Sequence, residues 1–194
     1  MIAAALELVG ERGPNAVTLG DVGQRVGTSH AAVLYHFRSR RDLLLAVLEE
    51  RDRRARTLLD RCFSDGGLAA LRRLADLGHG IQREPNFTKL AHVLQAESLE
   101  DNRVGRYFRA RYQYIRGGLA RAIRTGQQRG EIRDGFDVDA RAAEITAFMF
   151  GIAQQHFMDP DSLDVVAVYA DFVHNLVADI AVDGAEADRT SVQR

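Results

Sequence analysis

The chain has 194 residues, a hydrophobic fraction of 46%, a charged fraction of 27% and a formal net charge of −1, values typical of a soluble globular protein. Its single cysteine excludes an intrachain disulfide, and its longest apolar run, Ile145 to Ala153, is about half of a membrane span, so we expect a cytoplasmic protein. Because the net charge is close to zero, only a local basic patch could indicate nucleic-acid binding.

The first 37 residues carry the signals of three short helices, and the chain as a whole has three prolines and few alternating strand patterns. Apolar residues spaced three and four apart from Ile2 onward predict a first helix that ends at Gly13–Pro14. Thr18 begins a second short helix, which Gly27 ends, and Ser29 begins a third.

The rest of the chain predicts six longer helices. We therefore expect an all-α fold, with a three-helix N-terminal domain over residues 1–45 and a six-helix C-terminal domain over residues 46–194. The six helices are predicted over about 41–63, 68–83, 87–99, 103–129, 138–157 and 162–182, with a turn at 100–102 and a polar tail from 183.

The stretch from Gly27 to Phe37, GTSHAAVLYHF, indicates a helix-turn-helix, because it joins two short helices by a tight glycine-containing turn. The second helix of such a motif enters the major groove of DNA, so its outward face must be slim, with hydrogen-bond donors at its edges. Ala31 and Ala32 meet the first need, and His30 and Tyr35 meet the second.

The local charge agrees with this interpretation. Between Arg12 and Arg41 there are five arginines and one acidic residue, Asp21, which gives a local charge of +4. A patch of this kind attracts the phosphate backbone of DNA.

Two other classes of function remain open on the pattern alone. The segment from Ser29 to Phe37 could be a capped helix in a bundle with a solvated arginine face, as in an adaptor that binds only protein. A helical enzyme is the other alternative, but Lys89 follows no glycine-rich phosphate loop and no serine lies in a G-x-S-x-G motif. We therefore expect no catalytic residue, no cofactor and no metal site.

Residues 17–50, VTLGDVGQRVGTSHAAVLYHFRSRRDLLLAVLEE, resemble the DNA-binding region of TetR-type transcriptional regulators. Three positions depart from the family pattern, with Gly23 for a common alanine, Thr28 for the usual valine and Leu34 for the first aromatic residue of YxHF. The positions in register are Thr18, Val22, Gly27, Ser29, His36, Phe37, Arg40, Leu43 and Leu44.

The resemblance implies roles for individual residues. Thr18 would cap the second helix and offer its hydroxyl to a phosphate. Ser29, His36 and Arg40, which begins the fourth helix, would hold the phosphate backbone from either side of the groove. Phosphate contacts set affinity and register, whereas the residues that face bases set sequence. The residues expected to bind double-stranded DNA are Thr18, Thr28, Ser29, His30, Ala31, Ala32, Leu34, Tyr35, His36 and Arg40, of which His30, Ala31, Ala32 and Tyr35 would face the bases.

The C-terminal part resembles the regulatory half of the same family, and residues 106–160 are similar to its BetI-like type. This implies a domain that binds a small-molecule effector and forms a homodimer. Glu97 and Arg111 are charged residues on otherwise apolar helix faces, so they form either a structural ion pair or the polar anchors of a ligand. The predicted ligand-binding residues are Phe87, Leu90, Leu94, Glu97, Phe108, Arg111, Tyr112, Phe148, Met149 and Gln155.

The last two helices are apolar around most of their surface, so each needs burial on two sides. They are either fully buried core helices or a dimer interface built as a four-helix bundle, and the resemblance favours the dimer. A two-fold dimer would place its two recognition helices about 34 Å apart on a palindromic site. The predicted interface residues are Phe150, Ile152, Val165, Tyr169, Phe172, Val173, Leu176 and Ile180.

Together these features predict a dimeric DNA-binding transcriptional regulator. We expect a repressor that a small-molecule ligand releases from a palindromic operator, by favouring a dimer whose recognition helices are wrongly spaced.

Overall fold

The computed structural model describes residues 1–99 and 103–182, apart from the side chains of Thr57, Leu58, Arg61, Cys62 and Glu97. Within these ranges nearly all of the regular structure is helical, and one isolated antiparallel bridge joins Ile132 to Ala181. The predicted all-α fold is therefore confirmed. The predicted turn at 100–102 and the polar tail from 183 lie outside the described residues.

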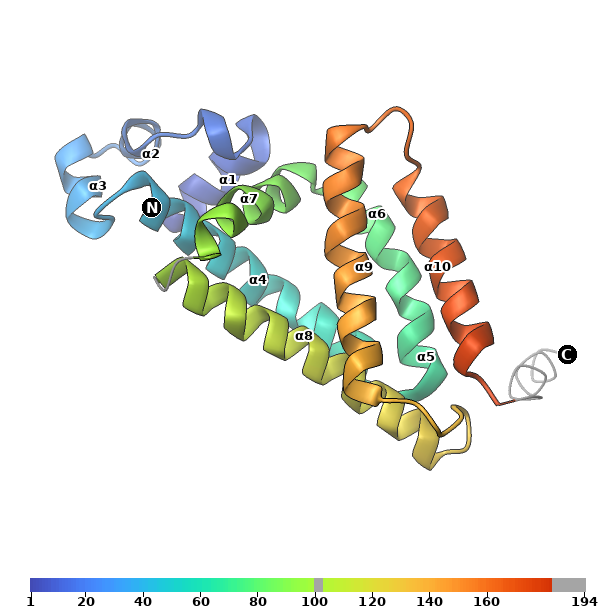
Figure 1. Ribbon diagram of the computed structural model, residues 1–194. Coiled ribbons are helices and arrows are strands. Elements are labelled where there is room, and N and C mark those ends of the chain that lie inside the picture. The colour runs from blue at the N-terminus through green and yellow to red at the C-terminus, as the bar shows by residue number, and fades with distance from the viewer. Residues whose placement is uncertain (100–102, 183–194) are drawn as a thin grey trace, which may run out of the picture. The chain divides into compact units, whose positions relative to one another are not determined.

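Figure 1 labels the helices in chain order. The N-terminal helices begin and end close to the predicted positions, because each has a local cap signal. The α-helices are α1 (Ile2–Arg12), α2 (Leu19–Arg25), α3 (His30–His36), α4 (Arg40–Ser64), α5 (Gly67–Arg72), α6 (Asp76–Arg83), α7 (Pro85–Ala96), α8 (Arg103–Gln128), α9 (Val138–Met158) and α10 (Val165–Ile180), with the short 3-10 helices η1 (Pro14–Ala16), η2 (Arg73–Ala75) and η3 (Glu97–Leu99).

The single helix predicted over 68–83 is wrong, because η2 divides it into α5 and α6. Leucines recur every three residues through this stretch, from Leu68 to Leu77. That spacing suits the three residues per turn of a 3-10 helix as well as it suits an α-helix. The pattern therefore hides the change of helix type.

Two helix starts also differ from the prediction. Pro85 begins α7 as its first residue instead of only ending the helix before it, a position where its missing N–H is no loss. The last helix begins at Val165 and not at 162, because the Asp164 carboxylate accepts from the amides of Val166 and Ala167 at 3.0 and 3.1 Å.

The described chain forms two compact units. Unit 1 comprises Met1–Thr57 and Ile81–Arg111, and unit 2 comprises Leu58–Gly80 and Tyr112–Arg194. In unit 1, α1 packs on α2 and α7, and α2 packs on α3. The core of unit 1 includes the fully buried α1 residues Ala5 and Val9 and the run Leu43–Leu48 at the start of α4. The functional domains predicted at 1–45 and 46–194 are a separate division, which stays a prediction.

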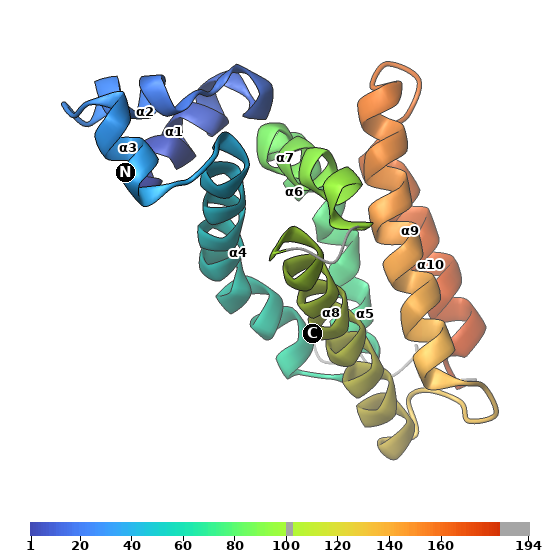
Figure 2. The ribbon, with the colours of Figure 1, turned by 60° about the vertical axis from the view of Figure 1, so that its left-hand side comes forward.

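Unit 2 is built around the antiparallel pair α9 and α10, with α5 packed against α10 (Figures 1 and 2). Gly78 brings α6 close to the start of α10, since a Cβ there would lie 3.0 Å from the Val166 Cα. The buried core of unit 2 contains Leu68, Leu71, Leu74, Ile115, Leu119, Ala120, Ile123, Ile132, Ala142, Ile145, Val173, Leu176, Val177 and Ile180.

Two features are absent from the described part of the chain. No helix there has the length and apolarity to cross a membrane. No cluster of three or more His, Cys, Asp or Glu side chains in the same residues could hold a metal ion.

Candidate DNA-binding surface

Thr18 and Asp21 define the start of α2 through reciprocal hydrogen bonds. The Thr18 hydroxyl accepts from the Asp21 amide at 3.1 Å, and the Asp21 carboxylate accepts from the Thr18 amide at 2.8 Å and from the Thr18 hydroxyl. These bonds from Thr18 hold the pKa of the Asp21 carboxyl below its usual value. The result is a complete capping box, so the entry of the chain into α2 is determined locally.

The turn between α2 and α3 depends on two glycines with different roles. Gly27 has a φ of 69°, a left-handed conformation that other residues rarely adopt. Gly23 allows a close approach, because a Cβ there would lie 2.9 Å from the Thr28 carbonyl oxygen. The Thr28 amide also donates to the Gly23 carbonyl at 2.9 Å. The glycine that departs from the family pattern therefore lets α2 pack directly on the turn.

α3 is fixed on one side and open on the other. The Ser29 hydroxyl oxygen accepts from the Ala32 amide at 3.1 Å, and Val33 is completely buried. Tyr35, in contrast, is 87% exposed, and its ring meets the His36 ring edge-on with the centroids 5.6 Å apart. A large aromatic side chain held in solvent by a rigid short helix is available to a binding partner.

All ten residues predicted to contact DNA lie in unit 1, and contact with DNA itself stays a prediction. They fall into two groups by exposure. Thr18, Ser29, His30, Ala31, Leu34, Tyr35 and His36 are exposed, whereas Thr28, Ala32 and Arg40 are half-buried.

Arg40 makes contacts that the sequence did not indicate. Its Nε donates to the Val17 carbonyl at 2.8 Å, and its Nη2 donates to the Pro14 carbonyl. The resemblance assigned this side chain to a DNA phosphate. In the structure its guanidinium binds the backbone that precedes α2.

The basic patch is weaker than the sequence window suggested. Arg25 pairs with Glu11 at 2.8 Å and with Glu7 at 3.4 Å, and Arg12 lies 3.4 Å from Asp21. The hydrogen bond from Arg25 lowers the pKa of Glu11. Because both glutamates lie just before the window from Arg12 to Arg41, the count of +4 missed them, and including them gives +2.

The residues predicted to bind a ligand fall in both units. Glu97 has a side chain outside the described residues, so its predicted pairing with Arg111 is not tested. Leu90, Leu94 and Phe108 are buried. Phe87, Leu90, Leu94, Glu97, Phe108 and Arg111 belong to unit 1, and Tyr112, Phe148, Met149 and Gln155 belong to unit 2.

Arg111 has a partner that sequence reasoning missed. Its Nη1 lies 3.1 Å from Oδ2 of Asp52, and the Tyr107 hydroxyl donates to the same carboxylate oxygen. Asp52 also lies 3.3 Å from Arg51, which in turn pairs with Glu84 at 3.1 Å. No sequence signal distinguished Asp52 from the other charged residues of α4.

The residues predicted at a dimer interface are mostly interior to the chain. Ile152, Val165, Tyr169, Val173, Leu176 and Ile180 are buried within the protomer, whereas Phe150 and Phe172 are half-buried. Their role at an interface stays a prediction.

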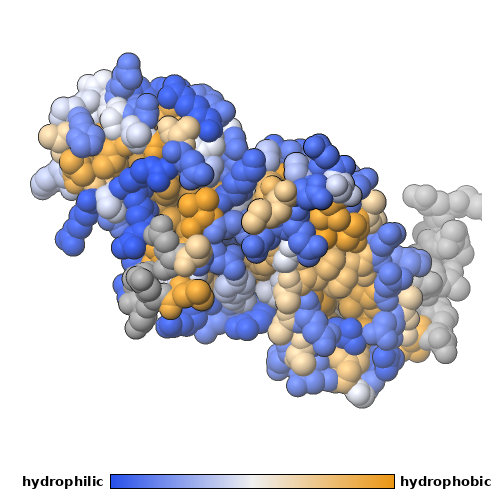
Figure 3. Space-filling model, turned by 45° about the horizontal axis from the view of Figure 1, so that its top comes forward, coloured by the Kyte–Doolittle hydropathy of each residue, from blue (hydrophilic) through white to orange (hydrophobic). Residues whose placement is uncertain are grey.

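The surface over α9 and α10 carries a largely apolar area (Figure 3). Phe148 of α9 and Phe172 of α10 are half-buried and stack, with ring centroids 3.6 Å apart and an interplanar angle of 5°, so an aromatic contact joins the two helices.

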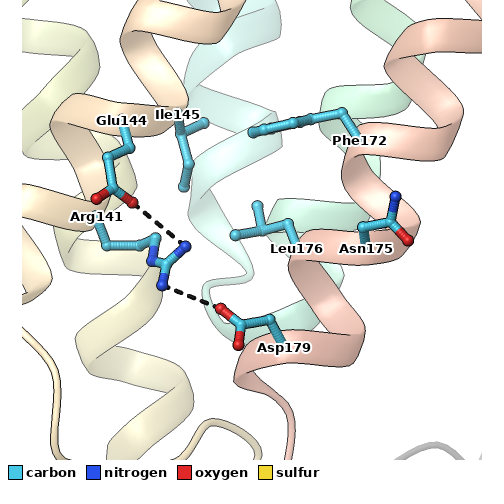
Figure 4. A pocket seen from close by; sticks show the side chains of 7 residues that line it. All are labelled: Arg141, Glu144, Ile145, Phe172, Asn175, Leu176 and Asp179. Carbon is cyan, nitrogen blue, oxygen red and sulfur yellow. Dashed lines mark ion pairs between the residues drawn. The ribbon is translucent and has the colours of Figure 1, made fainter.

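A small cavity also lies between α9 and α10, with a volume of about 220 Å³. Arg141 lies in it between Glu144 at 3.3 Å and Asp179 at 3.0 Å (Figure 4). The volume is below that of most small-molecule sites. Its lining residues are Arg141, Glu144, Ile145, Phe172, Asn175, Leu176 and Asp179, none of which was predicted to bind a ligand.

Comparison with known proteins gives a consistent result. The model described as "Bacterial regulatory proteins, tetR family" matches residues 1–47, and that described as "BetI-type transcriptional repressor, C-terminal" matches residues 74–180. A Pseudomonas putida protein, "Probable HTH-type transcriptional regulator ArpR", is 26% identical over 187 residues, which cover 86% of this chain and 82% of that protein.

Solved structures share the fold. A TetR transcription regulator from Haloarcula marismortui superposes with a TM-score of 0.80 at 20% identity, covering 93% of this chain and 96% of that one. A transcriptional regulator from Saccharomonospora viridis, solved in complex with choline, gives a TM-score of 0.72 at 24% identity, covering 93% and 95%. Both resemblances seen in the sequence are confirmed by the family matches. The chain belongs to the TetR family of bacterial regulatory proteins, with a C-terminal region of the BetI type.

Proposed function

We propose that this DNA-binding regulator is a repressor, which binds a palindromic operator as a homodimer and leaves it when a small-molecule effector binds. The observation that carries the proposal is the division of α3 into two faces. Tyr35 on the outward face is 87% exposed, whereas Val33 on the inward face is completely buried. A rigid helix with a slim, polar-edged outer face suits the major groove.

Contacts to DNA divide into two kinds in this proposal. Thr18, Ser29 and His36 contact phosphates. The Ser29 hydroxyl has its proton available, because its oxygen accepts from the Ala32 amide, whereas the Thr18 hydroxyl must exchange its bond to the Asp21 carboxylate for one to a phosphate. The residues proposed to face the bases are His30, Ala31, Ala32 and Tyr35, with Thr28 and Leu34 beside them.

The proposed dimer forms through α9 and α10. Half-buried Phe172 and Phe148 stack on the apolar surface and would be covered by a second copy of the chain. The buried members of the predicted interface, such as Val173 and Leu176, then act from within the protomer by setting the spacing of the two helices. Apolar surface of this kind is a frequent mark of a protein–protein contact.

The proposed effector is a small organic molecule held by apolar side chains with a few polar anchors. Buried Leu90, Leu94 and Phe108 supply apolar surface in unit 1, and Arg111 with its partner Asp52 supplies charge. The choline complex of the Saccharomonospora viridis protein supports a small organic molecule as the class of effector. The proposal assigns no catalytic residue, cofactor or metal, and places the protein in the cytoplasm with its DNA.

Selection from random duplexes tests the proposal. The full chain should enrich a palindrome with half-sites about one helical turn apart, and its affinity should fall as salt rises. Enrichment of no symmetric site, or an affinity that salt leaves unchanged, would contradict operator binding.

Release by an effector is a separate test. A compound found by its stabilisation of the protein against heat should weaken operator binding, and the operator should weaken binding of that compound by the same factor. Equal affinity for the compound with and without operator would rule out this mechanism.

A further inference from the structure

We propose that Arg40 is a positioning residue of the DNA-binding surface, which holds the segment from Pro14 to Val17 in place for Thr18. Its two hydrogen bonds go to backbone carbonyls three residues apart, at Pro14 and at Val17. A planar guanidinium can donate to both at once, because its N–H groups form a rigid fork.

The site of these contacts is partly enclosed. Arg40 is half-buried at the first position of α4, while Pro14 is buried and Val17 is completely buried. Buried backbone carbonyls need a donor, since leaving one unpaired costs about as much as a lost hydrogen bond. Val17 has an extended conformation after the short helix η1, so regular secondary structure does not supply that donor.

The segment that Arg40 holds leads directly into the DNA-binding elements. Thr18 follows Val17 and caps α2 through its capping box with Asp21. α2 then contacts the turn before α3 at Gly23, where no space for a Cβ remains beside Thr28. A shift of Val17 would therefore move Thr18 and the start of α2. Because α2 packs on the turn before α3, α3 would move as well.

A second contact holds the end of α1, just before this segment. The Asn86 side chain in α7 donates to the Gly10 carbonyl at 2.7 Å, and the Gly13 amide donates to the Val9 carbonyl at 2.9 Å. The last turn of α1 is thus bound to α7, and the segment that follows it is bound to α4. The hydrogen bond from Arg40 to the Val17 carbonyl is the contact that lies next to Thr18.

Lysine at position 40 would not replace arginine in this role. An ammonium group is a compact point charge, whereas the two carbonyls require donors spread over a plane. A side chain whose role was only to attract a phosphate would tolerate lysine. Lysine carries the same charge, and the salt dependence of DNA affinity reports the number of such charges at phosphates. Arg40→Lys therefore separates the two roles.

The first experiment needs no DNA. Hydrogen–deuterium exchange of the full chain is followed over residues 15–18 for the parent, for Arg40→Lys and for the control Arg38→Lys, which changes an exposed arginine two residues away. Loss of a charge-assisted hydrogen bond should speed exchange in this segment by about tenfold or more in Arg40→Lys and leave it unchanged in Arg38→Lys. Equal protection in Arg40→Lys and the parent would overturn the proposal.

The second experiment rests on the proposed DNA binding. The logarithm of operator affinity is plotted against the logarithm of salt concentration for the parent, Arg40→Lys and Arg40→Ala. We expect both variants to bind more weakly with the parental slope, since the displaced contact is that of the uncharged Thr18 and no cation is lost from a phosphate. A slope lower by about 0.9 in Arg40→Ala, restored by Arg40→Lys, would make Arg40 a phosphate ligand and overturn the proposal. If the parent binds no duplex, the proposed function fails, and the exchange experiment still decides the role of Arg40.

Discussion

The Tyr107 hydroxyl and the Asp52 carboxylate form a hydrogen bond that joins α8 to α4 within unit 1, and Arg111 approaches the same carboxylate oxygen at 3.1 Å. Both side chains of the ion pair are about one-fifth exposed, so water screens it only in part. α4 is the helix that follows the DNA-binding motif, which makes Asp52 a structural link between that motif and α8.

Replacement of Asp52 should therefore destabilise the protein. Asp52→Asn removes the charge that Arg111 faces and weakens the bond from Tyr107, so we expect the free energy of unfolding to fall by about 1–3 kcal/mol. Urea denaturation followed by circular dichroism measures this. Glu84→Gln is the matched control, because Glu84 pairs with Arg51 at an exposed site and its loss should change stability by less than about 1 kcal/mol. Equal effects of the two changes would contradict the partly buried role of Asp52.

Alkaline pH should weaken the fold through Tyr107 and Tyr169. Burial raises the pKa of Tyr107 and of Tyr169 above the ordinary value of about 10. Above that value the unfolded chain loses these protons while the folded chain keeps them, so stability is complete below about pH 10 and falls as pH rises further.

Tyr169→Phe tests this directly, because it removes one of these two phenols. The loss of stability between about pH 9 and pH 11 should be smaller in this variant than in the parent. Tyr35→Phe, at the exposed tyrosine, should follow the parental curve. If the stability of Tyr169→Phe fell with pH as steeply as that of the parent, loss of the Tyr169 phenol proton would not be linked to unfolding.

Three glycines near the DNA-binding turn should respond differently to alanine. Gly23→Ala should lower the free energy of unfolding by about 1–3 kcal/mol, because its Cβ would meet the Thr28 carbonyl oxygen. Gly27→Ala should cost about 1 kcal/mol through its positive φ alone, since the space around it is open.

Gly20→Ala is the control within α2, where a Cβ would make ordinary contact at 3.6 Å with Thr18. A helical glycine replaced by alanine gains about 0.5–1 kcal/mol, so the sign of its effect should be opposite. The midpoint temperatures of thermal unfolding rank the three variants by stability. Destabilisation by Gly20→Ala would contradict the helical assignment at that position.

Tyr35 and Val33 should separate DNA recognition from stability. Tyr35→Ala should change the free energy of unfolding by less than about 0.5 kcal/mol, yet weaken operator binding unevenly across operator variants if the ring faces a base. Val33→Ala removes a completely buried side chain and should cost about 1–3 kcal/mol. Uniform weakening by Tyr35→Ala on every sequence would assign that residue to phosphate contact instead.

Phe172→Asp should dissociate the proposed dimer, because it places a charge beside Phe148 on the apolar surface of α9 and α10. Light scattering coupled to size exclusion should then report a monomer where the parent is a dimer. Ala170→Asp places the same charge at an exposed position on the opposite side of α10 and should leave the parental mass unchanged. A dimeric Phe172→Asp would exclude this face as the interface.

Local signals predicted the helix-turn-helix well. Thr18 and Ser29 cap their helices through partners three residues away, and Gly27 supplies its positive φ, so each feature depends on a few neighbouring residues. The all-α fold followed from the same kind of information, because helical spacing is a property of short windows.

Long-range contacts could not be predicted in this way. Asp52 meets Arg111 from a position 59 residues earlier in the chain, and nothing in either helix marks the pair. Arg40 matched a family position, but only the folded chain shows that it binds the backbone at Pro14 and Val17. Leucines spaced by three fitted two kinds of helix, so the division between α5 and α6 depends on tertiary packing.

The pairing of Arg25 with Glu7 and Glu11 has a consequence for the search for an operator. A genome offers about a million or more competing sites, and the occupancy of one operator depends on how weakly the protein holds the others. By neutralising an arginine next to the DNA-binding turn, the two glutamates of α1 reduce the attraction to arbitrary sequence. In the proposed function, the acidic side chains of α1 would therefore favour release from wrong sites and leave more of the protein free to reach the right one.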